Sequence, residues 1–182
     1  MRDFVRSQGL TYLAHVMRRV SDEFVKSFDQ WYPDVGMKAP ARTRSTLLAL
    51  RQHGSLGVVE LSDLLSQSHP LVITWLRQLT ALGMIRMQTD PSDRRRTVVT
   101  LTPRGEAEAK KGSYSAKVAE VAYKRLLQET DAEMVFEAIW RMEEACRRKP
   151  FIERLREASE ELGGPAWQAG ERTRRTKRVA NH

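Results

Sequence analysis

The sequence has little of what a membrane, secreted or disulfide-bonded protein requires. It contains no run of about 18 apolar residues, so no membrane-spanning helix is expected. The stretch 1–20 carries charges within its apolar part and no small-residue cleavage site, unlike a secretory signal. Its single cysteine, Cys146, leaves no internal disulfide to form and fits a reducing compartment. We therefore expect a cytoplasmic protein with no membrane partner.

Patterns typical of catalysis and cofactor binding are also missing. There is no glycine-rich phosphate loop and no defensible Ser/His/Asp arrangement, and acidic residues alternate with basic ones along helix faces. The histidines are scattered, without a spacing that would bring several metal ligands together. We predict no catalytic residue, no metal and no cofactor. Cys146 is expected to be a small buried side chain.

Positive charge is what the sequence has in excess. Lys and Arg number 31 against 23 Asp and Glu, a formal net charge of +8. This balance favours a polyanionic partner, without by itself separating nucleic acid from an anionic membrane surface. Residues 163–182 are expected to form a disordered basic tail, either without a role or adding non-specific phosphate contacts.

Residues 61–83 have the pattern of two short helices joined by a polar turn. Leu61 and Leu65 share one face of the first helix. The second begins at Ser68 or His69 and carries an apolar stripe that ends before Gly83, made of Val72, Leu76, Leu79 and Leu82. On its outward side we predict DNA contacts from Ser68, His69, Pro70, Leu71, Thr74 and Arg77. Trp75 is expected to pack at the helix edge.

Two alternating segments, 85–89 and 97–101, predict a β-hairpin with a basic tip, and residues 56–58 could add a third strand. The tip reads Asp93-Arg94-Arg95-Arg96. Beside a recognition helix, such a cluster favours DNA contact over a merely solvated charge run. We predict that Arg95 enters the minor groove, that Asp93 orients an arginine through a bidentate pair, and that Arg94 and Arg96 bind phosphates.

Helices are predicted on both sides of this region. Apolar residues recur at spacings of three and four over 10–31, which indicates one long helix, either a core helix or one shared with a second subunit. A further helix is predicted over 42–52. Another begins after Thr102 and runs to about residue 128. The last long helix is expected to start within 130–133 and to be broken at Pro150.

The stretch 61–105 resembles the MarR (multiple antibiotic resistance regulator) family. The residues that carry the resemblance are Leu61, Leu65, Leu79-x-x-x-Gly83-Met84-Ile85-Arg86, Asp90-Pro91-x-Asp93-Arg94-Arg95 and Val99-x-Leu101-Thr102-x-x-Gly105. The wing pattern with its spacing is the specific part, and Asp93 and Arg95 hold the family's positions. Leu71 departs from the family's small polar residue.

The resemblance implies a mainly α fold with a small β-hairpin wing. A single domain would span 1–162, with a winged helix-turn-helix at about 40–104 and dimerisation helices at about 3–32 and 103–162. The implied function is a homodimeric transcription regulator, expected to be a repressor, that binds a pseudo-palindromic operator in double-stranded DNA. Two recognition helices would enter successive major grooves.

A small-molecule effector pocket is expected where the dimerisation helices meet the winged helix. Its predicted lining is Tyr12, His15, Met17, Phe28, Trp31 and Tyr32. The competing hypothesis is a winged-helix module for protein–protein contacts, with the basic wing on an acidic partner. An enzyme is a distant third. Some relatives carry an acetyltransferase domain after the winged helix, for which this chain has no room.

Overall fold

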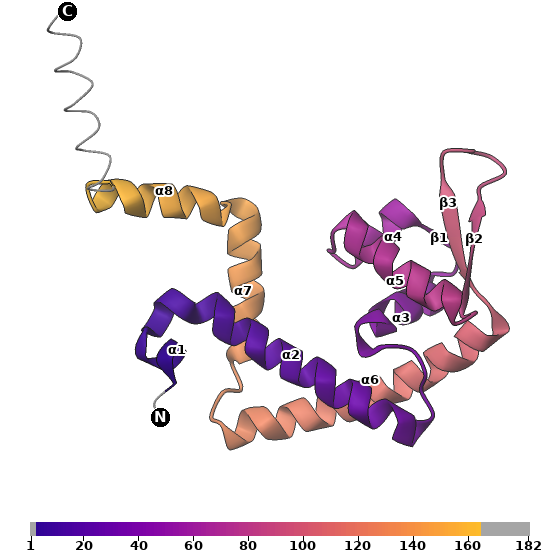
Figure 1. The fold of residues 1–182 in the computed structure, drawn as a ribbon, viewed down its shortest axis with the longest axis horizontal. Helices are drawn as coiled ribbons and strands as arrows, with labels where there is room; N and C mark the ends of the chain where they lie inside the picture. Colours follow the sequence, from indigo (N-terminus) through magenta and orange to yellow (C-terminus); the bar gives the residue numbers. More distant parts are fainter. Residues whose placement is uncertain (1–2, 165–182) are drawn as a thin grey trace, which may run out of the picture. The chain divides into compact units, whose positions relative to one another are not determined.

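A computed structural model describes residues 3–164 and is mainly helical, with one small sheet (Figure 1). The basic tail predicted for 163–182 lies, from residue 165 onward, outside the described residues. None of the described helices is long and apolar enough to cross a membrane. Contacts divide the chain into two compact units, one reaching to Val121 and one beginning at Ala122. The boundary falls within the helix that spans Pro103–Glu129.

The first unit contains the winged helix. Its elements are α1 (Phe4–Ser7), the 3₁₀ helix η1 (Gly9–Tyr12), α2 (Leu13–Trp31), η2 (Tyr32–Val35), η3 (Ala41–Thr43), α3 (Arg44–His53), β1 (Leu56–Gly57), α4 (Val58–Leu64), α5 (His69–Ala81), β2 (Ile85–Thr89), β3 (Thr97–Leu101) and most of α6 (Pro103–Glu129). The second unit holds the end of α6, then α7 (Val135–Arg148) and α8 (Phe151–Glu161).

The sheet confirms the predicted hairpin and the predicted third strand. Its strand order is β1-β3-β2, with both pairs antiparallel. Val99 at the centre of β3 faces Met87 on one side and Leu56 on the other. Val58 of the predicted third strand instead begins α4. The alternation of 85–89 and 97–101 therefore located both hairpin strands, in which Ile85 and Val99 are the buried residues.

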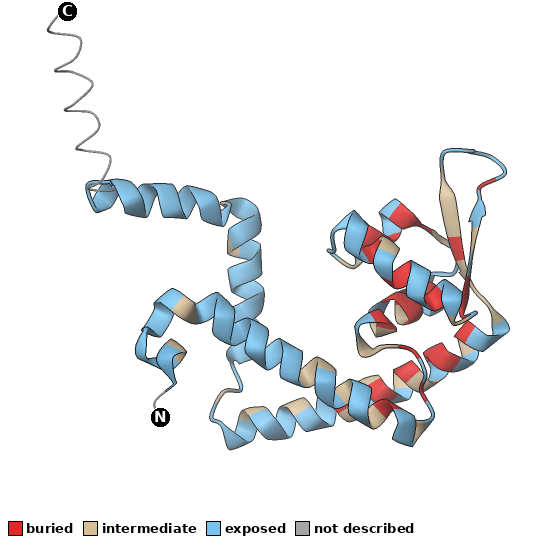
Figure 2. Cartoon of the chain, viewed as in Figure 1, coloured by how far each residue is buried: buried red, intermediate tan, exposed pale blue. Residues whose placement is uncertain are grey.

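The core of the winged helix is built on the predicted stripe of α5. Val72, Leu76 and Leu79 are fully buried, and Leu82 is partly buried against the same cluster. Trp75 is buried too, which confirms that it packs rather than reaching outward. Each such side chain contributes about 1.5–3 kcal/mol by leaving water. Figure 2 shows buried residues gathered in the winged helix and the adjoining part of α6.

A tight junction joins the sheet to the start of α6. Thr102 caps the helix, because its Oγ1 accepts from the backbone N–H of Gly105 at 3.1 Å. The same oxygen donates to the carbonyl of Gly83 at 2.7 Å, and the Thr102 N–H donates to the carbonyl of Met84 at 3.0 Å. A Cβ placed on Gly105 would lie only 1.9 Å from the Met84 oxygen. The Leu-Thr-x-x-Gly pattern is therefore a packing requirement.

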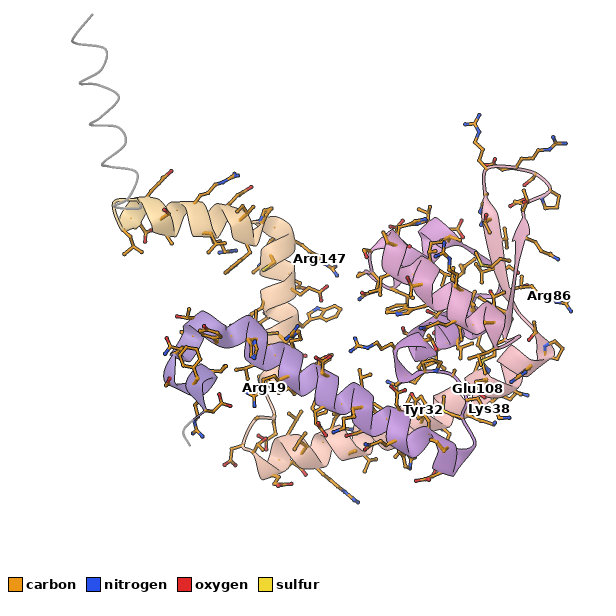
Figure 3. The ribbon with its side chains drawn as sticks, viewed as in Figure 1. Arg19, Tyr32, Lys38, Arg86, Glu108 and Arg147 are labelled. Atoms are coloured by element: carbon orange, nitrogen blue, oxygen red, sulfur yellow. The ribbon has the colours of Figure 1, made fainter. Side chains whose placement is uncertain are left out.

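Hydrogen bonds also fix the segment between α2 and α3. The buried carboxylate of Glu108 on α6 accepts from the backbone N–H groups of Lys38 and, at 2.8 Å, Ala39 (Figure 3). Asp29 on α2 accepts from the N–H of Ala41 at 2.7 Å. The chain entering α3 is thus held from both sides.

Two helix starts were predicted wrongly. Residues 10–31 do not form one helix: Gly9 adopts a left-handed conformation with φ 60°, a 3₁₀ turn follows, and α2 begins at Leu13. The last long helix begins at Val135, not within 130–133. The hydroxyl of Thr130 donates to the carbonyl of Leu126, so it closes α6 instead of capping α7. Pro150 does break the helix, as predicted, and caps α8.

Candidate nucleic-acid interface

The outward face of α5 presents the predicted contact residues to solvent. Thr74 and Arg77 are exposed in the middle of the helix. The helix N-terminus adds four exposed positions: Ser68, His69, Pro70 and Leu71. The Thr74 hydroxyl donates to the carbonyl of Pro70 at 3.0 Å, which leaves its oxygen free to accept a hydrogen bond from a base. These positions thus offer polar, cationic and apolar side chains of the kinds that contact a DNA groove.

The wing tip carries two arginines that are available for an external partner. Arg94 and Arg95 are exposed, and neither guanidinium has a hydrogen bond or ion pair within residues 3–164. Asp93 shapes the turn through the backbone: its Oδ1 accepts from the Arg95 N–H, and its carbonyl accepts from the Arg96 N–H, both at 2.9 Å. The prediction that Asp93 orients a guanidinium is therefore wrong, because its carboxylate binds a main-chain N–H.

Arg96 differs from the two tip arginines. Its Nη2 donates to both carboxylate oxygens of Glu60, at 2.7 and 2.9 Å, and its Nη1 donates to Asp90 at 2.7 Å. Glu60 lies in the first turn of α4, and Asp90 follows β2 directly. We name Arg96, Glu60 and Asp90 the wing clasp. The prediction that Arg96 binds a phosphate does not fit these contacts, since two carboxylates already hold its guanidinium.

The clasp has a clear electrostatic signature. The hydroxyl and N–H of Ser92, followed by Arg96, hold the pKa of Asp90 at about 2, below its usual 3.8. Hydrogen bonds from the Gly57 N–H and then from Arg96 lower the pKa of Glu60. Asp90 and then Glu60 raise the pKa of Arg96. All three groups are therefore ionised at neutral pH.

A cleft of about 460 Å³ lies beside the clasp, between the wing, α4 and the start of α5. Apolar side chains, two arginines and two carboxylates line it, among them Val59, Ile73, Met87, Arg95, Arg96, Glu60 and Asp93. Sequence reasoning did not predict this cleft, because its walls come from three separate stretches of the chain.

The predicted effector-pocket residues fall into two separate groups. Tyr12 and His15 meet edge to face near the start of α2, with ring centroids 6.1 Å apart, and Met17 lies in the same part of the helix. Phe28, Trp31 and Tyr32 pack together around the other end of α2. Twenty residues of mostly helical chain span about 30 Å, so the six do not line one cavity within this unit.

Tyr32 is the buried member of the second group. Its side chain is 2 % exposed, and its hydroxyl is buried without a hydrogen-bond partner among the described residues. The guanidinium of Arg44 lies over the neighbouring Phe28 ring, 4.9 Å from its centroid. This end of α2 therefore combines aromatic surface, a cation and an unsatisfied hydroxyl.

Cys146 was expected to be buried, and that prediction is wrong, because the cysteine is exposed on α7. No residue of α7 is buried in the second unit, so a small apolar side chain there finds no core to enter. Within residues 3–164, no three His, Cys, Asp or Glu side chains gather closely enough to hold a metal ion.

Comparison with known proteins identifies the architecture. No family model and no curated protein sequence matches the chain. Among solved structures it resembles the S. aureus MepR–DNA complex, with a TM-score of 0.61 and 22% identity over 73% of this chain and 96% of that one. A probable transcriptional regulator from Pseudomonas aeruginosa gives 0.57 and 22% identity over 70% of this chain and 96% of that one.

PcaV, a transcriptional regulator from Streptomyces coelicolor in complex with its natural ligand, gives a TM-score of 0.60 and 20% identity over 73% of this chain and 92% of that one. These solved structures belong to MarR-family regulators. The chain has the MarR-type winged-helix fold. This confirms the predicted fold class. At these identities the fold is what is shared, and the DNA on MepR and the ligand on PcaV are properties of those proteins.

Proposed function

We propose that this protein is a MarR-type transcription regulator that binds double-stranded DNA sequence-specifically as a homodimer, with residues 1–162 acting as one functional domain. The observation that carries the proposal is the pairing, within one compact unit, of an exposed polar and cationic face on α5 with two exposed guanidiniums at the wing tip. An α-helix fits the major groove, and an arginine on a thin hairpin fits the minor groove.

In this proposal, helix α5 and the wing make different contacts with DNA. Thr74 and Arg77, near the middle of α5, read base edges, while the N-terminal residues Ser68 and His69 contact the backbone. At the wing, Arg95 enters the minor groove and Arg94 binds a phosphate. Phosphate contacts orient the protein, and base contacts give sequence preference. Repression is the expected result, because a dimer on an operator blocks access to the promoter.

Exposed apolar side chains support the homodimer. On α2 they are Leu13, Val16, Met17 and Val20, and on α7 they are Val135, Phe136, Ile139, Trp140 and Met142. Neither helix has a buried residue. Apolar surface arranged in this way along whole helices marks an interaction site more often than a solvated face. A second copy of the chain would cover these faces and place two α5 helices on one operator.

An effector site is proposed at the C-terminal end of α2, around Tyr32. Burial of a hydroxyl without a partner costs free energy that a ligand hydrogen bond would recover. A bound molecule alters DNA affinity only if it prefers one spacing of the two winged helices over the other. A coupling of about 1–3 kcal/mol would relieve DNA binding roughly 5–150-fold. An aromatic anion suits the Phe28 and Arg44 surroundings.

The experiment begins by selecting a preferred duplex from a random DNA pool with the full chain. Arg95→Ala should weaken binding to that duplex by about 1–3 kcal/mol without changing the melting temperature. Thr74→Ala should shift the preferred bases, whereas Arg94→Ala should weaken all duplexes alike. A protein that enriches no DNA at low salt, yet binds an acidic protein partner through its wing, would refute DNA binding.

A further inference from the structure

We infer that Arg96 is a positioning residue: the wing clasp orders the wing for DNA, and the Arg96 guanidinium itself makes no DNA contact. This rests on the proposed function, and it assigns opposite roles to neighbours in the run Arg94-Arg95-Arg96. Two point outward as ligands for DNA, and the third is held inward by carboxylates.

The clasp ties together three parts of the winged helix. Glu60 lies 36 positions before Arg96 and belongs to the first turn of α4. Its carboxylate also accepts from the Gly57 N–H at 2.9 Å, so it is fixed before Arg96 binds. The Arg96 side chain lies close to the main chain at Gly57, since a Cβ added to Gly57 would lie 3.1 Å from the Arg96 Nε. The end of the wing loop, where β3 begins, is thereby fastened to α4, which packs against α5.

Arg96 and Asp90 also join the two ends of the loop between β2 and β3. The Asp90 N–H donates to the Arg96 carbonyl at 2.9 Å, and the Asp90 side chain receives both the Ser92 hydroxyl and the Arg96 guanidinium. A loop that is ordered in advance loses less conformational freedom when it binds. Arg94 and Arg95, which lie inside this loop, are therefore presented in a restricted range of positions.

The charge balance argues against a phosphate role for Arg96. One guanidinium meets two carboxylates, so the clasp as a whole carries a negative charge and offers nothing to an anion. Simple electrostatics predicts that removing Glu60 should tighten DNA binding, because repulsion between an acid and phosphates disappears. The clasp predicts the reverse, because the wing would lose its anchor. The direction in which DNA affinity changes therefore distinguishes lost charge repulsion from the loss of a wing anchor.

The test uses the full chain and a fluorescein-labelled duplex selected from a random pool by the wild-type protein. Glu60→Gln removes the charge but keeps an oxygen that can accept from Gly57, as glutamine does in a capping box. Asp63→Asn is the matched control, since it removes an exposed charge from the same helix outside the clasp. Glu60→Gln should weaken binding roughly threefold to tenfold, and Asp63→Asn should leave it equal or tighter.

Salt dependence distinguishes a positioning residue from a phosphate ligand. Arg94→Ala should reduce the slope of log affinity against log salt by about 0.9, the value for one lost phosphate contact. Arg96→Ala should weaken binding while keeping the wild-type slope. Arg96→Lys should recover only part of the affinity, because an ammonium cannot bridge two carboxylates as a guanidinium does.

Each outcome decides one claim. Tighter binding by Glu60→Gln, or a slope loss in Arg96→Ala equal to that of Arg94→Ala, would overturn the positioning role. If the wild-type chain binds no duplex, the proposed function fails instead. The clasp is then judged alone by amide exchange at the Ser92 and Arg95 N–H groups. Faster exchange in Glu60→Gln supports it, and unchanged exchange refutes it.

Discussion

Helices α5 and α7 have nearly the same length, 13 and 14 residues, and both carry an apolar stripe, but their surroundings differ completely. Four residues of α5 are buried, and Leu76 is 0 % exposed. No residue of α7 is buried, and Phe136 is 66 % exposed. The stripe of α5 is covered by other elements and forms a core, whereas the stripe of α7 is exposed and is the surface proposed to pair two copies. The winged helix and the adjoining part of α6 thus share one core, whereas α7 has no buried residue.

The largest effect is expected inside the core. Leu76→Ala should lower the free energy of unfolding by about 2–5 kcal/mol, because it leaves a cavity that its neighbours cannot fill. Phe136→Ala on α7 is the matched truncation. Its cost should depend on protein concentration, since the proposed homodimer would cover that side chain with a second copy. Chemical denaturation at two protein concentrations measures the free energy of unfolding of both variants. If both lost the same free energy, with the same dependence on protein concentration, α5 and α7 would not differ as described.

A second large effect is expected at the junction between the sheet and α6. Gly105→Ala should destabilise the fold by about 1–3 kcal/mol or more, because the added methyl would meet the Met84 carbonyl. Gly112→Ala lies on the same helix, where the nearest atoms are 3.6 Å away. It should be neutral or slightly stabilising, because alanine suits a helix better than glycine. Thermal melts of the pair provide the measurement.

A charge placed on the α7 stripe should act on assembly. Ile139→Asp should raise the dimer dissociation constant at least about tenfold, or ~1.4 kcal/mol, because a carboxylate would be buried at the interface. Arg141→Asp also introduces a carboxylate, roughly 200° around the helix and in place of a cation, and should leave assembly intact. Sedimentation equilibrium reports both. A wild-type chain that stays monomeric would show that the exposed stripe does not pair two copies.

The smallest effect concerns the clasp and pH. The folded pKa of Asp90 is about 2 against the ordinary 3.8, so its ionised form stabilises the fold above about pH 3.8. That stabilisation is lost as the pH falls from 3.8 toward 2. Asp90→Asn should therefore show a shallower loss of melting temperature across this window than the wild type. Identical pH profiles would mean that the ionised Asp90 carboxylate, held by Ser92 and then by Arg96, adds nothing to stability.

Local patterns predicted the winged helix well. Alternation located β2 and β3, and Gly83, with φ 67°, follows the end of α5 as expected of a helix-terminating glycine. The clasp could not be predicted, because Glu60 is 36 residues from Arg96 and no local pattern links them. The start of α7 was missed because Thr130 looks like a cap, while its hydroxyl binds a carbonyl of the preceding helix.

Hydroxyl-radical footprinting on a selected duplex tests the central claim most directly, namely that one region reads DNA while the other pairs two copies. Two symmetric protected segments are expected, centred about one helical turn, ~10 base pairs, apart. Ile139→Asp should lose this paired pattern at concentrations where the wild type keeps it. A single protected segment that Ile139→Asp leaves unchanged, or binding without any defined protection, would contradict this division of roles.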